Sequence, residues 1–337
     1  MIVAIDGTPL TVSSGGVRRY TTELTRALQA NYPEDEIHIL SDQLQPVAGL
    51  DRRWWTIGVQ RAMARVNCEI FHGTDFAVPY LPLRPSVLTL HDLSPWMNPA
   101  WHHAAGRVRR RTPYLLKLGI ATMVLTVSEA VRSRAIDHFN LVASRVVAVH
   151  LAAGSHLQPV EMPPPPVPYF LYVGTIEPRK NVPALISAWR HVRTSHNVDL
   201  VLVGRRRADA PTIATVPGLR ILGEVEDEYL PALYSGCIAT VYPTDYEGFG
   251  LPVLEAMQCG APVITTHDPA VTEVSGGAAI HVSADNLAEA MEGILTNPEE
   301  RQRRRELSLR RAAEFSWTRT AAQTRAVYLE AIRRFHA

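Results

Sequence analysis

The sequence predicts an α/β protein of two doubly wound domains, each a parallel sheet covered by helices. Short runs rich in branched apolar residues alternate with segments of helical periodicity. A proline-rich stretch interrupts this alternation near the middle of the chain, after which it begins again. The 337 residues are enough for two domains that each bury a core.

The first series of elements precedes the proline-rich stretch. Branched and apolar residues favour strands, and longer segments with apolar positions three and four residues apart favour helices. On this basis the expected order is strand 2–6, helix 17–30, strand 86–92, strand 123–128, helix 129–139 and strand 145–150.

The second series repeats this architecture without repeating the sequence. The expected order is strand 169–174, helix 181–192, strand 199–204, strand 219–223, helix 227–234, strand 237–242, a helix within 247–260 and strand 261–266. The tail from residue 297 is helical, and its many arginines are expected to form a solvated face.

Four consecutive prolines at 163–166 can continue neither a helix nor a strand, so they predict a stiff connector. The predicted organisation is a Rossmann-like domain over 1–160, a linker over 161–168, a second Rossmann-like domain over 169–315 and a helix over 316–337.

Composition and charge narrow the classes of function. A formal net charge of +1 gives no global case for nucleic-acid binding, and any polyanion site must be local. No apolar run is long enough to span a bilayer, and the N-terminus lacks a basic leader, so a cytoplasmic location is expected. Cys68, Cys237 and Cys259 are far apart, which predicts reduced, mostly buried thiols and no metal cluster.

Residues 247–255, EGFGLPVLE, are the most informative stretch of the sequence. Pro252 suits the first turn of a helix, and Gly260 is expected to end that helix. The glycines allow close approach of a ligand, and a helix start attracts phosphate. Glu247 on the loop and Glu255 on the helix could accept hydrogen bonds from sugar hydroxyls.

Other interpretations of the two glutamates remain open at this point. Glu255 could simply be an acidic residue in a first helical turn, and Glu247 a solvated loop residue. The pair could also be the acid and nucleophile of a glycosidase, which lie roughly 5 to 9 Å apart. The spacing in sequence does not fix the distance between the carboxylates.

Three further motifs follow predicted strands, where ligands bind in doubly wound sheets, so the site is expected in the cleft between the domains. Gly15 and Gly16 precede a helix and could form an anion or acceptor loop, or only a tight turn. His91 ends an apolar strand and could contact a sugar hydroxyl, while Asp92 is expected to orient the turn. Arg179 and Lys180 in EPRKN could neutralise a diphosphate and stabilise a leaving phosphate.

A basic cluster lies at 107–111, where RVRRR precedes YLLKLGI. It could rest on anionic headgroups or bind an acceptor's diphosphate. A solvated helix face is the alternative.

Several motifs occur in the order typical of one family. From the N-terminus they are GGVRRY, HDL at a strand end, EPRKN, the two glutamates eight residues apart, and GAPVITT. Together they resemble the group 1, or family 4, retaining glycosyltransferases of the GT-B fold, over nearly the whole chain. GT-B proteins have two Rossmann-like domains facing across a cleft. The resemblance implies that the N-terminal domain over 1–160 lies on the acceptor side, that the domain over 169–315 binds the nucleotide sugar, and that the helix over 316–337 crosses back to the first domain.

The resemblance implies roles for the matching residues. Glu247 would contact the donor sugar, Glu255 the ribose, and Arg179 with Lys180 the diphosphate. His91 would reach the sugar near its reacting carbon. The backbone around Phe249, Gly250 and Leu251 would meet the phosphates, and Gly16 would approach them from the first domain. Gly15, Gly174 and Thr175 would also bind the donor. Thr175 departs from the family, since many members carry an arginine there, so either Arg179 supplies that charge or the diphosphate is held more weakly.

The resemblance also implies the reaction. The expected activity is hexosyl transfer with retention from a nucleotide sugar, GDP-mannose by preference, to a glycan or lipid-linked acceptor in cell-surface polysaccharide biosynthesis. No cofactor or metal is expected, and peripheral contact with the inner membrane surface is an option. A UDP- or dTDP-sugar donor, a sugar-nucleotide epimerase and a non-enzymatic binding subunit remain alternatives.

Overall fold

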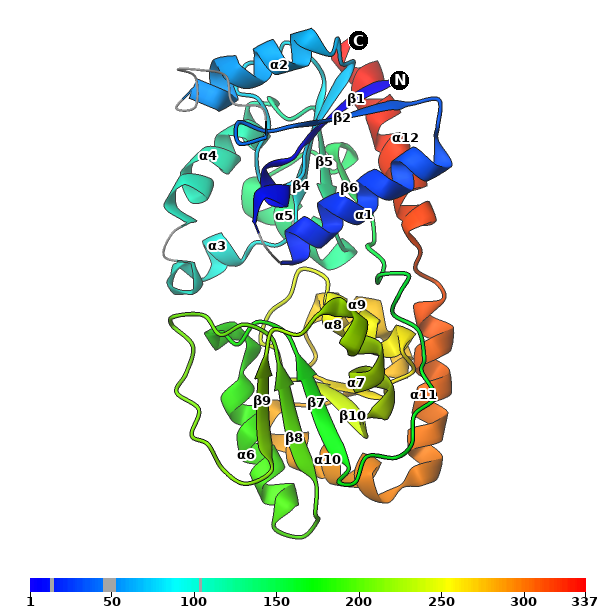
Figure 1. Cartoon of the computed structure of the whole chain (residues 1–337). Helices are drawn as coiled ribbons and strands as arrows, with labels where there is room; N and C mark the ends of the chain where they lie inside the picture. The colour runs from blue at the N-terminus through cyan, green and yellow to red at the C-terminus, as the bar shows by residue number, and fades with distance from the viewer. Residues whose placement is uncertain (13–14, 45–52, 103–104) are drawn as a thin grey trace. The chain divides into compact units, whose positions relative to one another are not determined.

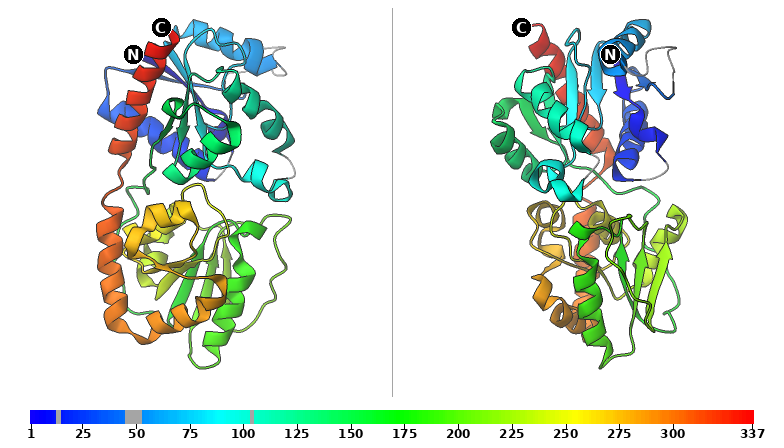
Figure 2. Two further views of the ribbon diagram at one scale, coloured as in Figure 1. Left: turned by 180° about the vertical axis from the view of Figure 1, so that it is seen from behind. Right: turned by 90° about the vertical axis from the view of Figure 1, so that its left-hand side faces the viewer.

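The computed structural model describes residues 1–12, 15–44, 53–102 and 105–337, and the chain divides into two compact units (Figure 1). Unit 1 comprises Met1–Leu151 and Ser316–Ala337, and unit 2 comprises Ala152–Phe315. Each unit is described by itself below. Both contain a parallel sheet with helices packed on it (Figure 2).

The sheet of unit 1 has six strands in the order β2-β1-β3-β4-β5-β6. All of its pairings are parallel, and every residue of β4 and β5 is buried, as expected of strands covered on both faces. The strand order changes direction between β1 and β3, which defines a topological switch point. The strands are β1 (Ile2–Asp6), β2 (Glu36–Leu40), β3 (Ile70–Gly73), β4 (Ser86–Leu90), β5 (Met123–Thr126) and β6 (Val146–Ala148).

Helices α1 and α12 lie side by side in unit 1, although they come from opposite ends of the chain (Figure 1). Helix α12 also contacts strands β3, β4 and β5. The α-helices of the unit are α1 (Gly16–Asn31), α2 (Val59–Arg65), α3 (Ser94–Met97), α4 (Gly106–Lys117), α5 (Glu129–Phe139) and α12 (Trp317–Phe335). Short helical turns are η1 (Thr8–Thr11), η3 (Trp54–Gly58), η4 (Pro99–Trp101) and η6 (Ala143–Arg145).

A buried polar network attaches α12 to the sheet of unit 1. His72 of β3 lies with Nδ1 2.7 Å from the hydroxyl of Tyr328 and with Nε2 2.8 Å from Oγ1 of Thr89. The hydroxyl of Tyr20, on α1, lies 3.1 Å from the same Thr89 oxygen. Burial lowers the pKa of His72 to about 3, so its imidazole is neutral, with one nitrogen donating and the other accepting.

The sheet of unit 2 also has six strands, in the order β12-β11-β10-β7-β8-β9, and is parallel throughout. Its switch point lies between β7 and β10, the two central strands. The strands are β7 (Tyr169–Val173), β8 (Asp199–Val203), β9 (Leu219–Gly223), β10 (Ala239–Tyr242), β11 (Val263–Thr265) and β12 (Ile280–His281).

The helices of unit 2 follow its strands along the chain. The α-helices are α6 (Val182–Arg193), α7 (Leu230–Gly236), α8 (Leu251–Gln258), α9 (Pro269–Ser275), α10 (Leu287–Thr296) and α11 (Pro298–Ala312). Short turns are η7 (Pro178–Lys180), η8 (Asp227–Tyr229), η9 (Gly276–Ala278) and η10 (Ala284–Asn286).

The strands expected from apolar runs are present, and the two doubly wound sheets are confirmed. Strands β2, β3 and β12 were not expected from the sequence. The run IFHG of β3 is too short to be recognised as a strand from its pattern alone. Strand β2 lies at the edge of the sheet and is only partly buried, so its sequence is not a continuous apolar run.

The first unit ends at Leu151, before the expected boundary at residue 160. The segment after Leu151 is bonded to unit 2, because the side-chain amide of Gln258 donates to the carbonyls of Gly154 and Leu157, at 2.8 Å each. The four prolines therefore lie within unit 2.

The arginines of α11 do not all form the solvated face that the sequence suggested. Arg304 donates through Nη1 to the carbonyls of Gly277, Ala278 and Ala279, and Arg311 donates to the carbonyl of Val274. These contacts satisfy carbonyl groups at the end of α9 and in η9.

No helix in the described part of the chain is both long enough and apolar enough to cross a membrane. The three thiols are free and buried, as expected, and burial raises the pKa of Cys68 to about 11 and of Cys237 to about 12.

Tyr328→Phe should lower the free energy of unfolding by about 1 to 2 kcal/mol, because it leaves Nδ1 of the buried His72 without its partner. Urea unfolding measures the loss. Tyr229→Phe, at a side chain that is 57% exposed, is the control and should change the free energy by less than about 0.5 kcal/mol. Equal stability of the Tyr328 variant and the wild type would contradict the role given to this network.

Candidate functional site

The candidate residues of unit 2 lie on the loops that follow β7 and β10. These two strands are paired at the switch point, so both loops leave the sheet at the same edge. The first loop carries Arg179 and Lys180 in η7, and the second carries Glu247. The fold therefore brings together residues that are far apart in sequence.

The carboxylate of Glu247 is held between two cations. Its Oε1 forms an ion pair with Nζ of Lys180, and its Oε2 lies 3.3 Å from Nη1 of Arg179. Glu247 and Lys180 are each only 6% exposed. A buried carboxylate and a buried ammonium compensate each other's loss of hydration only in such close contact.

Neutral partners complete the surroundings of this pair. Thr244 donates to Oε1 of Glu247 at 2.8 Å, and Lys180 donates to the hydroxyl of Tyr242 at 2.6 Å. The ring of Tyr242 stacks on Tyr172, with centroids 5.8 Å apart. Burial raises the pKa of both phenols, so they remain protonated.

The ionisation of Glu247 follows from these contacts. Burial alone would raise the pKa of its carboxyl, but Lys180 and Arg179 outweigh that effect and lower the pKa to about 2. Burial lowers the pKa of Lys180, and the Glu247 carboxylate opposes that shift. Glu247 is thus an anion at neutral pH and is unsuited to be the proton donor of a glycosidase.

The pairing differs from the sequence hypothesis in one respect. Arg179, Lys180 and Glu247 were expected to contact different parts of one ligand, whereas the structure pairs the cations with the glutamate. The reason is burial: without a ligand, each of these charges needs a partner of opposite sign.

Two charged residues of this site were not identified from the sequence. Glu177 lies with Oε1 2.8 Å from Nε of Arg179, and its Oε2 accepts a hydrogen bond from Nη1 of Arg207 at 2.5 Å. Arg207 lies on the loop after β8. Both residues closely follow a strand end, the same signal that singled out Arg179, but a single charged residue in such a loop is too common a feature to be distinctive.

Helix α8 begins where the sequence predicted, with Pro252 in its first turn. Gly250 caps it with φ of +94°, and a Cβ there would lie 3.2 Å from Cγ2 of Val271, so this position requires glycine. Glu255 is buried, and its Oε2 accepts a hydrogen bond from the hydroxyl of Tyr234 at 3.3 Å. It is therefore not a solvated first-turn residue.

The remaining candidates of unit 2 flank these groups. Gly174 follows β7 with φ of +150°, and the carbonyl of Thr175 accepts a hydrogen bond from Tyr172 at 3.0 Å. Phe249 is buried and packs edge to face on Phe315, while Leu251 is the first residue of α8. The backbone of the first loop thus lies beside the end of β7, and the backbone of the second loop lies beside the start of α8.

The candidates of unit 1 follow β1 and β4. His91 lies with Nε2 2.7 Å from the carbonyl oxygen of Thr74, so Nε2 carries the proton. Its ring packs edge to face on Tyr20, with centroids 4.9 Å apart. Asp92 accepts hydrogen bonds from the backbone N–H and hydroxyl of Ser94, which confirms its expected role in the turn.

Gly15 and Gly16 begin α1, and Gly15 has φ of +131°. Among the described residues, no atom lies within 4 Å of a Cβ built at either position. Residues 13 and 14 of this loop lie outside the described residues. The roles given to Gly15, Gly16 and His91, and the location of the site between the domains, stay predictions.

The basic cluster on α4 divides into two parts. Arg109 donates to the carbonyl of His102 at 2.8 Å, and Arg111 lies over the ring of Trp55. Arg107 and Arg110 are exposed. The cluster is therefore partly structural.

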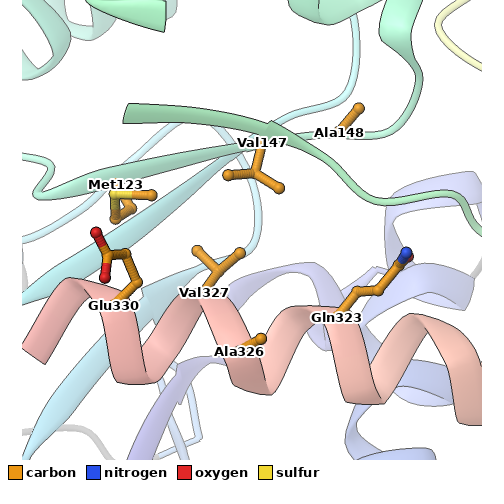
Figure 3. Close-up of a pocket in the computed structure, with 7 residues that line it drawn as sticks. All are labelled: Met123, Val147, Ala148, Gln323, Ala326, Val327 and Glu330. Carbon is orange, nitrogen blue, oxygen red and sulfur yellow. The ribbon is translucent and has the colours of Figure 1, made fainter. Parts of the chain in front are cut away.

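A pocket of about 300 Å³ lies in unit 1 between strands β5 and β6 and helix α12 (Figure 3). Side chains such as Met123, Val147 and Val327 point into it. None of the candidate residues lines it, and it offers no cation for a diphosphate. Within the described ranges, no group of His, Cys, Asp or Glu side chains could hold a metal ion.

Two doubly wound parallel units, with buried charged side chains at a switch point, are typical of α/β enzymes that bind nucleotides at the carboxyl edge of a sheet. Comparison with known proteins identifies the class more closely. The family described as glycosyl transferases group 1 matches residues 158–309.

Two relatives and one solved structure extend this match. The chain is 36% identical to O-antigen chain mannosyltransferase B of Escherichia coli, over 76% of this chain and 72% of that protein. It is 27% identical to O-antigen chain mannosyltransferase RfbU of Salmonella typhimurium, over 73% and 69%. The crystal structure of Anabaena HepE in complex with UDP and glucose covers 98% of this chain and 99% of its own, with a TM-score of 0.74 and 15% identity.

The chain belongs to the group 1 glycosyltransferases and has the GT-B fold. The family resemblance seen in the sequence is thereby confirmed.

Replacing Glu247 by Gln should remove a pH-dependent part of the stability. The folded pKa of about 2 lies below the ordinary 4.5, so the stabilisation is present above about pH 4.5 and is lost as the pH falls toward 2. The wild-type advantage over Glu247→Gln should therefore be about 1 kcal/mol smaller at pH 3.5 than at pH 7. Urea unfolding at both pH values measures it, and a constant difference would contradict the ion-pair assignment.

Proposed function

We propose that this glycosyltransferase moves mannose, with retention of configuration, from GDP-mannose to a glycan or lipid-linked acceptor in cell-surface polysaccharide synthesis. The observation that carries the proposal is the buried cluster of Arg179, Lys180 and Glu247 at the switch point of unit 2. The names of the two relatives favour mannose as the transferred sugar. The UDP complex of the structural neighbour supports a nucleotide-sugar donor.

The charges of the cluster suit a diphosphate if Glu247 exchanges partners. In the structure the two cations are neutralised by carboxylates. An entering diphosphate would take over their hydrogen bonds, and the Glu247 carboxylate could then accept hydrogen bonds from sugar hydroxyls. After this exchange the cations face the phosphates, and the Glu247 carboxylate is hydrogen-bonded to hydroxyl groups.

The same cations would assist the chemical step. As the bond between the sugar and the diphosphate breaks, negative charge grows on the leaving phosphate, and Arg179 and Lys180 would stabilise it. The acceptor hydroxyl would attack on the face that the diphosphate leaves, and its proton would pass to the leaving phosphate. This route retains configuration without a protein nucleophile.

The other candidates would orient the donor. Glu255, which lies near the hydroxyl of Tyr234, would accept hydrogen bonds from the ribose. The first residues of α8 and the loop with Gly174 and Thr175 would contact the phosphates, and His91 and Gly16 would approach the sugar and phosphates from unit 1. The reaction as proposed uses no cofactor and no metal ion.

A sugar-nucleotide epimerase is the competing function. It would change the nucleotide sugar without an acceptor, whereas a transferase leaves a nucleoside diphosphate and a lengthened acceptor. The family assignment favours transfer.

The donor is tested by thermal stabilisation with GDP, UDP and dTDP, followed by transfer from labelled GDP-mannose to a lipid-linked glycan. GDP at about 100 times its dissociation constant should stabilise the protein by about 2.7 kcal/mol. Glu247→Ala should lower the transfer rate at least about 100-fold, because the donor sugar loses the carboxylate that would accept hydrogen bonds from its hydroxyls and hold it in place. Stabilisation by UDP or dTDP alone would rule out GDP-mannose as the donor. Full activity of the Glu247→Ala variant would rule out the proposed site.

We also propose a cytoplasmic protein that rests on the inner membrane surface through α4. Exposed residues of this helix recur three and four positions apart, so they share one face; they are Arg107, Arg110, Tyr114 and Lys117, and Leu118 follows directly at the C-cap. Tyr114 and Leu118 are 67% and 71% exposed, and the helix contains no acidic residue. Cations flanking exposed apolar side chains suit anionic headgroups.

Flotation with lipid vesicles tests this contact. The wild type should bind vesicles that contain phosphatidylglycerol more strongly than vesicles of phosphatidylcholine alone. Arg107→Glu/Arg110→Glu should weaken that binding by at least about tenfold, because each cation near an anionic surface contributes about 1 kcal/mol of binding free energy. The control Arg303→Glu/Arg310→Glu, on exposed positions of α11, has the same charge change and should bind like the wild type. Equal losses in both variants would contradict a specific role for α4.

A further inference from the structure

Glu177 occupies the centre of a chain of alternating charges in unit 2. One carboxylate oxygen lies 2.8 Å from Nε of Arg179, and the other accepts a hydrogen bond from Arg207 at 2.5 Å. Arg179 continues to Glu247, and Arg207 continues to Asp209. The chain of charges thus joins the loops that follow β8, β7 and β10.

The position of Glu177 is fixed by the backbone as well as by its charges. The N–H of Ile176 donates to the carbonyl of Arg205 at 2.9 Å, and the N–H of Arg207 donates to the carbonyl of Ile176 at 3.1 Å. These bonds tie the loop after β7 to the loop after β8. Glu177 itself is only 5% exposed, so its carboxylate has little freedom to move.

The contact to Arg179 involves the end of the guanidinium that does not contact Glu247. Oε1 of Glu177 lies 2.8 Å from Nε in an ion pair that lacks the alignment of a hydrogen bond, while Nη1 donates to the oxygens of Glu247 and of the Tyr246 backbone, at 3.3 and 2.8 Å. When a ligand replaces Glu247 as the partner of Nη1, the contact at Nε can persist. Glu177 is therefore placed to hold the guanidinium plane still during that exchange.

We propose that Glu177 is a positioning residue of the donor site, which aims Arg179 at the outer phosphate of a nucleoside diphosphate. The inference rests on the proposed function, since Arg179 must contact that phosphate. The planar guanidinium binds phosphate in fixed directions, so its orientation matters as much as its charge.

If Glu177 positions Arg179, it should affect how well the site distinguishes a nucleoside diphosphate from a monophosphate. A nucleoside monophosphate shares the base and ribose with the diphosphate but lacks the outer phosphate. The ratio of the two dissociation constants reports on contacts to that phosphate, and a general loss of stability would weaken both ligands alike. The ratio separates positioning from a merely structural role.

Glu177→Gln is the informative variant. The side chain of glutamine ends in one carbonyl oxygen and one N–H₂ group. Because an arginine has only donors, the N–H₂ group cannot bond to it, so one of the two arginines must move. The ratio of the GMP to the GDP dissociation constant should fall about tenfold relative to the wild type, as expected for a lost charge-assisted contact. The rate of transfer at saturating donor should fall by a similar factor.

Asp209→Asn is the matched control. It removes the same negative charge from the same chain of ion pairs, but on the far side of Arg207 from Arg179. It should leave the ratio within about twofold of the wild type, because the contact between Glu177 and Arg179 survives. Glu177→Asp keeps the charge and should retain part of the discrimination.

Isothermal titration with GDP and GMP, and with UDP and UMP in parallel, measures these ratios on the full chain. Thermal unfolding without ligand checks that each variant is folded. A wild-type ratio in Glu177→Gln, or an equal fall in Asp209→Asn, would overturn the positioning role while leaving the proposed donor site intact. A wild type that does not distinguish diphosphates from monophosphates would overturn the donor site and this inference together.

Discussion

The burial of Glu247 between two cations is the constraint on which the candidate site depends. A carboxylate that is 6% exposed stays ionised only because Lys180 and Arg179 lie against it. The contact ties the loop after β10 to the loop after β7. Any ligand that takes the cations must provide negative charge of its own and leave Glu247 with new donors. A sugar diphosphate has both the charge and the hydroxyl groups for that exchange.

The parallel topology explains why these loops meet. In unit 2 the chain adds strands outward from β7 in one direction and then returns to add β10 on its other side. The connections that follow β7 and β10 leave toward opposite faces of the sheet, which is where doubly wound sheets bind ligands. The proposed donor site uses the charged residues at this point.

Unit 1 uses a buried network of a different kind. Its polar core groups are neutral: His72 has a lowered pKa, and its partners are hydroxyl groups. This network attaches α12, the last helix of the chain, to strands from the first third of the sequence. Neutral, satisfied groups of this kind fix a packing arrangement, whereas in the proposed function the paired charges of unit 2 change partners when a diphosphate binds.

The sequence by itself determined the class of fold, the start of α8 and the family, because these depend on local patterns. Branched runs predict strands, Pro252 predicts a helix start, and EPRKN with EGFGLPVLE marks the family. Only the tertiary structure decided which charges pair. Glu177 contacts Arg207, and Glu247 contacts Lys180, across separate loops. Which charges pair depends on which side chains are buried together and point toward each other, and a local sequence pattern does not contain that information.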